Sequence, residues 1–190
     1  MNVTVPAQHA LVSRVVNGIM PSRWGCLVMR ALVVPVDTML HLSSGGRLGM
    51  GRPLGIPSLL LTTTGARSGL QRSTPLCYVH HADGYAVIGS NFGLAHHPAW
   101  STNLLENPGA TVVTEGSEVP VTSRLVIGGE REEIWAKFLS LSTGYQTYRD
   151  RCARTFRIFH LKAAPPIPNP RAADCQCQSP SPPSTEGPAG

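Results

Sequence analysis

The segment 58–75 combines residue types that can bind an anion. An apolar run leads into the stretch Thr-Gly-Ala-Arg-Ser-Gly-Leu-Gln-Arg, which ends at residue 72. Gly65 and Gly69 can adopt backbone conformations that expose N–H groups. Arg67 and Arg72 add guanidinium groups, which match phosphate and carboxylate geometry. We therefore expect this turn, at the end of a strand, to anchor an anionic ligand. From spacing alone, an ordinary hairpin with solvated arginines is the alternative.

Two other short segments have residues suited to contact with a flat ring. Gly-Ser-Asn-Phe-Gly at 89–93 follows a predicted strand and places small polar side chains between glycines. His-Pro-Ala-Trp-Ser-Thr-Asn-Leu at 97–104 contains a proline suited to a first helical turn. Trp100 and Asn103 are three residues apart, so they fall on one helix face. Trp100 belongs to the core by default, but beside a ligand site its ring could pack against a heterocycle.

Several familiar catalytic patterns are missing from the sequence. It contains no Gly-x-Gly-x-x-Gly after a strand, no phosphate-binding lysine loop and no Gly-x-Ser-x-Gly nucleophile elbow. The adjacent histidine pairs at 80–81 and 96–97 lack the separation of zinc ligands, so we expect no metal. If the chain is an enzyme, a bound cofactor must supply the chemistry.

Charge is distributed unevenly along the 190 residues, whose net charge is +5. Residues 1–80 contain seven arginines and one acid, Asp37, whereas residues 81–190 contain nine basic and ten acidic residues. An anionic partner should therefore meet the first half of the chain. The basic residues are dispersed and have no aromatic residues interleaved, which argues against nucleic acid. A phosphorylated small molecule or an anionic membrane surface fits better.

The cysteines and the apolar runs bear on localisation. The five cysteines, an odd number, accompany no recognisable secretion signal, so we expect reduced thiols and a cytoplasmic protein. The longest apolar run, 26–36, is interrupted by Arg30 and Pro35 and is too short to span a bilayer. The helices predicted below for the N-terminal segment, with arginines nearby, could still lie on an anionic membrane surface, which would give membrane association without a span.

Periodicity and turn signals predict an α+β chain in which antiparallel strands dominate. Helical spacing appears in three N-terminal stretches, 7–20, 24–34 (ending before Pro35) and 37–42, and a glycine-rich loop at 43–57 follows. The later helices are expected at 98–106, 129–141 and 145–153. The strands are expected at 59–64, 73–80, 85–90, 110–115, 118–127 and 156–161, with tight turns at Asp83-Gly84 and Gly116-Ser117.

Short strands joined by hairpins favour an antiparallel barrel or sandwich over a doubly wound parallel sheet. The chain then divides into N-terminal helices at 1–44, a ligand-binding domain at 45–162 and a Pro/Ser-rich tail at 163–190, which we expect to be disordered.

From about residue 45 to residue 161 the chain resembles the deazaflavin-dependent nitroreductase and quinone reductase family of actinobacteria, a branch of the split β-barrel flavin-binding proteins. The resemblance rests on Leu-Leu-Leu-Thr-Thr-Thr-Gly-Ala-Arg-Ser-Gly at 59–69 and on Arg72 with Pro75-Leu76. It continues with the motifs at 89–93 and 97–108, in the family's order and at its spacing.

The resemblance implies a six-stranded split β-barrel with N-terminal and flanking helices that binds coenzyme F-420, an 8-hydroxy-5-deazaflavin with a phosphate and a polyglutamate tail. Arg67, Ser68 and Arg72 would then contact the phosphate and tail. The residues implied to line the deazaflavin ring are Pro75, Ser90, Asn91, Ala99, Trp100 and Asn103. Tyr145 and Tyr148 match the family's tyrosines near the substrate pocket. With Ser90, they are the candidate catalytic donors.

Three positions depart from the family pattern. Ala66 stands where the family turn usually has an arginine, so one phosphate contact would be missing. Some members have a lysine at the position of Asn91, and many have an apolar residue or a proline at the position of Arg157. The loss of one charge-assisted hydrogen bond, about 1.5–3 kcal/mol, would lower cofactor affinity by one or two powers of ten.

The implied activity is hydride transfer from reduced coenzyme F-420 to a small-molecule acceptor: a quinone, a nitro compound or an activated alkene. Two alternatives stay open at this point. The same barrel could bind FMN or haem, or the chain could be a non-catalytic deazaflavin-binding protein. Split barrels commonly pair, so a homodimer is a further expectation.

Overall fold

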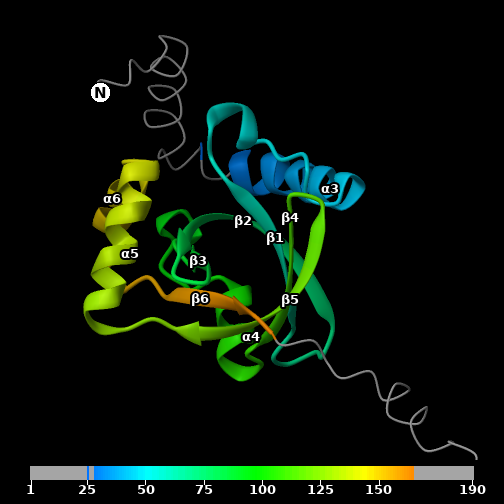
Figure 1. Cartoon of the computed structure of the whole chain (residues 1–190). Coiled ribbons are helices and arrows are strands. Elements are labelled where there is room, and N and C mark those ends of the chain that lie inside the picture. Colours follow the sequence, from blue (N-terminus) through cyan, green and yellow to red (C-terminus); the bar gives the residue numbers. More distant parts are fainter. Residues whose placement is uncertain (1–24, 26–27, 165–190) are drawn as a thin grey trace, which may run out of the picture.

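A computed structural model describes residue 25 and residues 28–164 of the chain (Figure 1). Six strands form a closed barrel in the order β1-β2-β3-β6-β5-β4, and each neighbouring pair is antiparallel. The strands are β1 (Ser58–Thr64), β2 (Gln71–His81), β3 (Gly84–Ile88), β4 (Gly109–Thr114), β5 (Ser117–Leu125) and β6 (Ile158–Ala163). The expected α+β fold with a six-stranded antiparallel barrel is confirmed.

Helices cover the barrel from several directions. In Figure 1, α5 and α6 lie side by side at one flank, α3 lies at the opposite flank and α4 lies below the sheet. The α-helices are α3 (Val34–Ser44), α4 (Ala99–Glu106), α5 (Gly128–Leu141) and α6 (Gly144–Arg151). Shorter helical segments are η1 (Met29–Val33), a π-helix, and the 3-10 turns η2 (Arg52–Leu54) and η3 (Asn91–Gly93).

Two apolar clusters form the core. One lies inside the barrel and includes Leu59, Leu61 and Phe159, each at most 1% exposed. The other packs Ile134 and Phe138 of α5 against the barrel wall. Leu59 to Leu61 form an unbroken apolar run because α3 and α4 cover the outer face of β1, so side chains of both faces are buried.

Most predicted elements are present, with differences at their ends. The helix expected to stop before Pro35 does not stop, because η1 runs directly into α3 and Pro35 lies in the first turn of α3, where a missing N–H costs nothing. Both predicted hairpins occur, but their central residues are Ala82-Asp83 and Glu115-Gly116, one residue earlier than expected. The strand expected at 156–161 pairs from Ile158 to Ala163, two residues later.

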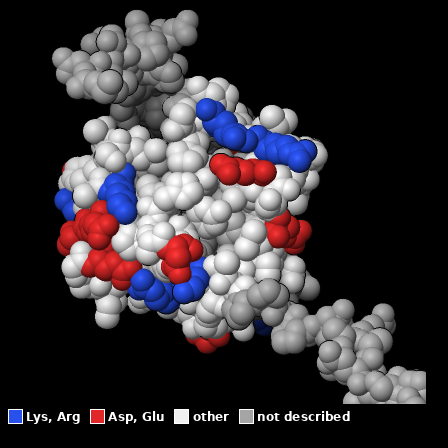
Figure 2. Space-filling view, in the orientation of Figure 1, with Lys and Arg blue, Asp and Glu red and all other residues white. Residues whose placement is uncertain are grey.

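Some expectations concern residues outside the described part of the chain. They are the helix at 7–20, the beginning of the helix at 24–34 (residues 24, 26 and 27), nearly all of the tail at 163–190, and Cys26, Cys175 and Cys177. Within the described part, no helix combines the length and apolarity needed to cross a bilayer. Figure 2 shows that the basic side chains of one face form small separate groups with acidic neighbours, so the positive charge on that face is local.

Candidate active site

A cavity of about 570 Å³ lies between one end of the barrel, α4 and α6. Its walls come from five places in the sequence: Val34 of α3, Ile56 before β1, residues 74–77 of β2, the segment from Ile88 to Trp100, and the segment from Leu141 at the end of α5 to Tyr148 of α6. Pockets for cofactors and small ligands commonly have this size and a mainly apolar lining with a few polar groups. The cavity is therefore the strongest candidate for a ligand site.

The structure brings most of the predicted site residues together in this cavity. Those that line it are Pro75, Ser90, Asn91, Ala99, Trp100, Tyr145 and Tyr148. Trp100 also belongs to the barrel core, since its side chain is 5% exposed and its ring meets the ring of Phe159 edge-on at 5.9 Å. Its indole is thus held rigidly while part of it borders the cavity.

Tyr145 forms a polar pair with a residue that the sequence did not single out, Cys77. The Tyr145 hydroxyl and the Cys77 thiol are hydrogen-bonded, and both residues line the cavity. Although part of Tyr145 stays accessible, burial of its hydroxyl raises its pKa well above the usual range. Burial likewise raises the pKa of Cys77 to about 11. Both groups therefore stay protonated near neutral pH. Since one of them donates to the other, the pair offers a ligand one hydrogen-bond donor rather than a charge.

The loop 89–94 forms one edge of the cavity and has an unusual backbone. Asn91, Phe92 and Gly93 are consecutive left-handed residues with φ of 47°, 55° and 74°. Non-glycine residues rarely adopt this conformation without outside support. The Phe92 ring lies edge-on to Tyr148 at 6.1 Å, and a side chain at Gly93 would approach the carbonyl oxygen of Tyr148 to 2.9 Å. The loop is thereby packed onto α6.

Arg154, which sequence analysis missed, supports this loop. Its guanidinium donates to the carbonyl oxygens of Leu94 at 2.8 Å, Gly89 at 3.0 Å and Ser90 at 2.6 Å. Its plane also lies over the ring of Phe156, 4.8 Å from the centroid. A single arginine some 60 residues after the loop offers no local pattern, so only the fold reveals this contact.

The glycine–arginine turn at 65–72 differs in part from its prediction. Gly69 has the expected positive φ, +66°, but Gly65 does not. Gly65 instead lies close to its neighbours: a Cβ there would lie 2.6 Å from the Ser68 hydroxyl, which would have to shift, and 3.1 Å from the Leu70 carbonyl oxygen. The turn also satisfies several of its own N–H groups, including Gly65 N to Leu70 O and Gly69 N to Gly65 O, both at 2.8 Å. It therefore exposes fewer backbone donors than we expected.

Asn103 does not line the cavity, contrary to the prediction. Its side chain is buried, accepts a hydrogen bond from the Ala66 N–H at 3.0 Å and donates to the Thr63 hydroxyl at 3.0 Å. The reason is its position one turn beyond Trp100 on α4, which directs it toward the end of β1 rather than the cavity. Asn103 thus fixes the 65–72 turn to the helix whose first turn borders the cavity.

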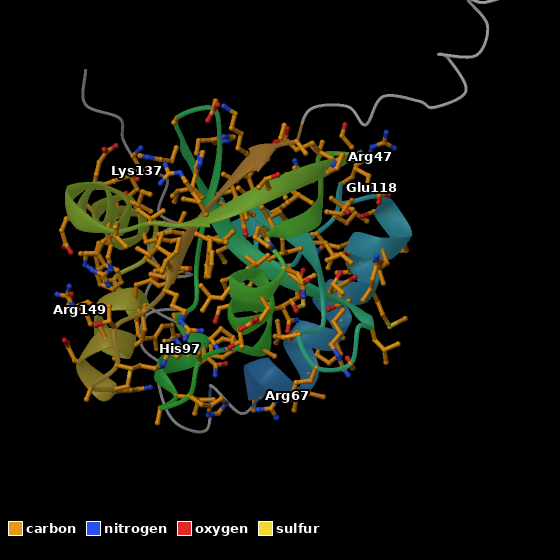
Figure 3. The ribbon with its side chains drawn as sticks, turned by 90° about the horizontal axis from the view of Figure 1, so that it is seen from below. Arg47, Arg67, His97, Glu118, Lys137 and Arg149 are labelled. Carbon is orange, nitrogen blue, oxygen red and sulfur yellow. The ribbon has the colours of Figure 1, made fainter. Side chains whose placement is uncertain are left out.

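Arg67, Ser68 and Arg72 are exposed and lie beside the cavity rather than in it. Neither arginine makes an ion pair or a side-chain hydrogen bond with any residue that the structure describes. Arg72 precedes Pro75 on β2 by three residues, which is about 10 Å of strand. Figure 3 shows Arg67 and His97 toward the same edge of the molecule.

A family model described as F420H(2)-dependent quinone reductase matches residues 36–162, which include the barrel up to the last residue of β6, most of α3 and every residue of the cavity except Val34. The chain belongs to this family. The match confirms the family expected from the motifs and extends it to most of α3, which we had grouped with the N-terminal segment.

Curated relatives and solved structures agree with the family. The chain is 31% identical over 105 residues to the F420H(2)-dependent quinone reductase Rv1261c of Mycobacterium tuberculosis, covering 55% of this chain and 70% of that one. A structure described as an F420-H2 dependent reductase (FDR-A) is 34% identical, with a TM-score of 0.52 over 56% of this chain and 94% of its own. Another, described as a domain-swapped dimer, is 30% identical, with a TM-score of 0.55 over 67% and 96%.

Within this quinone reductase family member, Arg157 has a structural contact. Its guanidinium donates to the Thr102 hydroxyl of α4 at 3.3 Å, so it ties the chain just before β6 to the helix beside the cavity. This contact accounts for a polar side chain at a position where the family resemblance led us to expect an apolar residue or a proline.

Proposed function

We propose that the cavity holds the deazaflavin ring of coenzyme F-420 and that the 65–72 turn binds its phosphate and glutamate tail. Family membership makes the chain an oxidoreductase that uses reduced coenzyme F-420 and passes a hydride to a quinone. The placement is supported by one observation above all: β2 carries lining residues of an apolar cavity of about 570 Å³ and also the exposed Arg72, and the turn that leads into β2 carries the exposed Arg67. A flat ring with a polyanionic tail needs both features within reach of one another.

The residues present fit this cofactor. Arg67 and Arg72, with the Ser68 hydroxyl, would bind the anionic tail, because their charges are not neutralised by any acid that the structure describes. The ring would lie against Trp100 and near Pro75 and Ala99, which supply apolar contact, while Ser90 and Asn91 supply polar edges. Asn103 would contribute indirectly: its amide is hydrogen-bonded to Ala66 and Thr63, so it holds the 65–72 turn in position.

The reduced cofactor, when bound, supplies a hydride to the acceptor. A quinone that gains a hydride becomes a hydroquinone anion and needs one proton. The protein must therefore exclude water and stabilise the negative charge that develops on the acceptor oxygen. We propose Tyr145, Tyr148 and Ser90, which line the cavity, as the hydroxyl donors for this role. Because the pKa of Tyr145 is raised, its hydroxyl is better suited to donating a hydrogen bond to that oxygen than to releasing its proton.

Nitro compounds and activated alkenes make the same demand, since negative charge also builds up on them as the hydride arrives. We include them as acceptors in the proposal. The cavity walls that would choose among acceptors are Val34, Ile56 and Leu141, which come from three separate segments.

One titration tests the proposal. Purified protein is mixed with oxidised coenzyme F-420, and binding is followed by the change in the ligand's fluorescence, with FMN and haem titrated in parallel. We expect saturable binding of coenzyme F-420 and weaker binding of the other two. Anaerobic oxidation of the reduced cofactor by a soluble quinone should then occur only with protein present. Preferential binding of FMN or haem would replace the proposal with the alternative cofactor.

A surface formed by η1 and α3 supports two proposals about partners. Leu32 and Val36, together with Met39 and Leu42, expose between 47% and 71% of their side chains. We propose that this surface allows peripheral contact with an anionic membrane, which would suit a lipid-soluble quinone. Flotation of the protein with anionic vesicles, with and without residues 1–44, tests this.

A homodimer is the second proposal. Light scattering at several protein concentrations tests it independently.

A further inference from the structure

Arg154 contacts His97 as well as the 89–94 loop. One guanidinium nitrogen lies 3.2 Å from Nδ1 of His97 and 3.0 Å from the carbonyl oxygen of Gly89. His97 also lines the cavity, immediately before the proline that precedes α4. One arginine therefore joins the loop that forms a cavity wall to a histidine of the same cavity.

The contact decides which nitrogen of His97 carries the proton. An arginine side chain remains protonated in proteins and has only donors, so Nδ1 of His97 must accept the hydrogen bond. A neutral imidazole has one acceptor nitrogen and one N–H. With Nδ1 as the acceptor, the proton is on Nε2. Arg154 thus selects the tautomer of His97 in which Nε2, the ring nitrogen that does not face Arg154, is a donor.

The surroundings keep His97 neutral. Burial lowers the pKa of His97 below its usual value, and the positive charges of Arg157 and Arg154 lower it further. The ion pairs that involve described residues include no carboxylate paired with His97. A neutral histidine presents an uncharged N–H without the cost of burying a charge.

We propose that His97 donates a hydrogen bond from Nε2 to an oxygen of the ring system bound in the cavity, and that Arg154 is the residue that positions it. This rests on the proposed function, since both ring systems expected there, the deazaflavin and the quinone, carry carbonyl-type oxygens. Arg154 has two linked tasks: it holds the left-handed segment Asn91–Gly93 and it orients the imidazole. Neither Arg154 nor His97 was among the residues predicted from the motifs.

The first test needs no ligand. In protein labelled with ¹⁵N-histidine, two-bond ¹H–¹⁵N spectra near pH 7 should show His97 with a bare Nδ1 and a protonated Nε2. The His97 signal is assigned by its loss in the His97→Phe variant. Changing Arg154→Met should raise the His97 pKa and populate the second tautomer. A wild-type His97 protonated on Nδ1 would overturn the proposal.

The matched control is Arg149→Met. Arg149 also stacks on an aromatic ring, 4.7 Å from the centroid of Trp135, whereas the guanidinium that donates to the carbonyl oxygens of the 89–94 loop is that of Arg154. We expect the His97 tautomer and pKa to be unchanged in this variant. An equal change in both variants would show that loss of an arginine acts through general charge or stability, and it would contradict the positioning role.

The second test identifies the oxygen. His97→Phe keeps a ring but removes the donor, whereas His97→Gln keeps an N–H near the position of Nε2. If the oxygen belongs to the cofactor, His97→Phe should weaken coenzyme F-420 binding about tenfold, as measured by fluorescence. If it belongs to the quinone, kcat/KM for the quinone should fall by a similar factor while the cofactor Kd stays constant. His97→Gln should recover most of either loss.

Unfolding midpoints of all variants are measured alongside. Wild-type values of both the cofactor Kd and the quinone kcat/KM in a folded His97→Phe protein would overturn the proposal. If the wild-type protein fails to bind coenzyme F-420 at all, the proposed function fails instead, and the tautomer experiment still reports whether Arg154 controls His97. The two failures are therefore distinguishable.

Discussion

Charged side chains form ion pairs at one region of the barrel, whereas at another region two arginines are exposed and have no acidic partner among the described residues. On the α5 side, Glu130 accepts hydrogen bonds from Arg124 at 2.7 Å and from His81 at 2.9 Å, and Lys137 pairs with Glu133 at 3.1 Å. On the α4 side, Arg67 and Arg72 have no such partner among the described residues. Figure 3 shows Lys137 and Arg67 toward opposite edges of the molecule.

The difference separates charges that serve the fold from charges that can serve a ligand. In the α5 network each cation meets an anion, so the network joins α5 to β2 and β5 but offers little attraction to an outside ion. The arginines of the 65–72 turn gain no such contact. A polyanionic ligand can therefore satisfy them, and we expect each region to respond to substitution in its own way.

Neutralising the turn should have the largest effect. The double change Arg67→Gln and Arg72→Gln removes two charge-assisted contacts, each worth about 1.5–3 kcal/mol, so the Kd for coenzyme F-420 should rise a hundredfold or more. Fluorescence titration measures it. Because both side chains are exposed, the unfolding midpoint should change little. Arg124→Gln is the control from the paired region, and its cofactor Kd should match wild type. Unchanged affinity in the double variant would remove the basis of the comparison.

The cavity hydroxyls should affect turnover more than binding. Tyr148→Phe removes a donor beside the cavity but leaves the turn intact, so kcat for quinone reduction should fall about tenfold or more while the cofactor Kd changes less than threefold. Steady-state kinetics and fluorescence titration on the same preparation give both numbers. Parallel losses of the same size would mean that Tyr148 acts through cofactor binding.

Restoring the arginine that the family pattern expects should strengthen the turn. The Ala66 side chain is exposed and only its backbone N–H is used, in the bond to Asn103, so Ala66→Arg should be tolerated. One added charge-assisted contact should tighten coenzyme F-420 binding about tenfold. The tightening should be lost as salt concentration increases, because the new contact is exposed. Ala66→Gln is the uncharged control. Equal tightening in both would exclude charge as the cause.

The paired region should show the smallest effect, limited to stability and to how stability depends on pH. The hydrogen bond from Arg124, followed by that from His81, lowers the pKa of Glu130 from 4.5 to about 2. A carboxyl whose pKa is lower in the folded state stabilises above its unfolded pKa and loses that contribution as the pH falls through the folded value. The midpoint temperature of thermal unfolding should thus fall less steeply between pH 5 and pH 2 for Glu130→Gln than for wild type. Identical slopes would contradict this assignment.

Sequence patterns identified most elements of the fold because their signals are local. The apolar run at 59–61, the turn signals near residues 83 and 116 and the proline at the start of α4 each lie within a few residues. Barrel closure was implied by the family resemblance, not by periodicity. The pairing of β3 with β6 joins residues 70 or more positions apart, such as Val87 with Phe159, and no local pattern indicates it.

The site was predicted in part for the same reason. Ser90, Ala99 and Trp100 lie in recognisable motifs, and the structure places them in one cavity. Arg154 and Cys77 were missed because their partners, the 89–94 loop and Tyr145, are distant in sequence. Asn103 was predicted beside the ring, whereas its amide lies against the 65–72 turn, because a helical face indicates direction and not which of two neighbouring features the side chain reaches.

The amino-acid order by itself determined that a glycine–arginine turn follows an apolar strand, that a tryptophan and an asparagine share a helix face, and that metal-binding spacings are missing. Tertiary structure decided that the turn consumes several of its own N–H groups, that Asn103 supports it, and that Arg154 holds the loop and His97. Residue types and short spacings encode local geometry directly. Hydrogen bonds between distant segments depend on how the closed barrel brings those segments together.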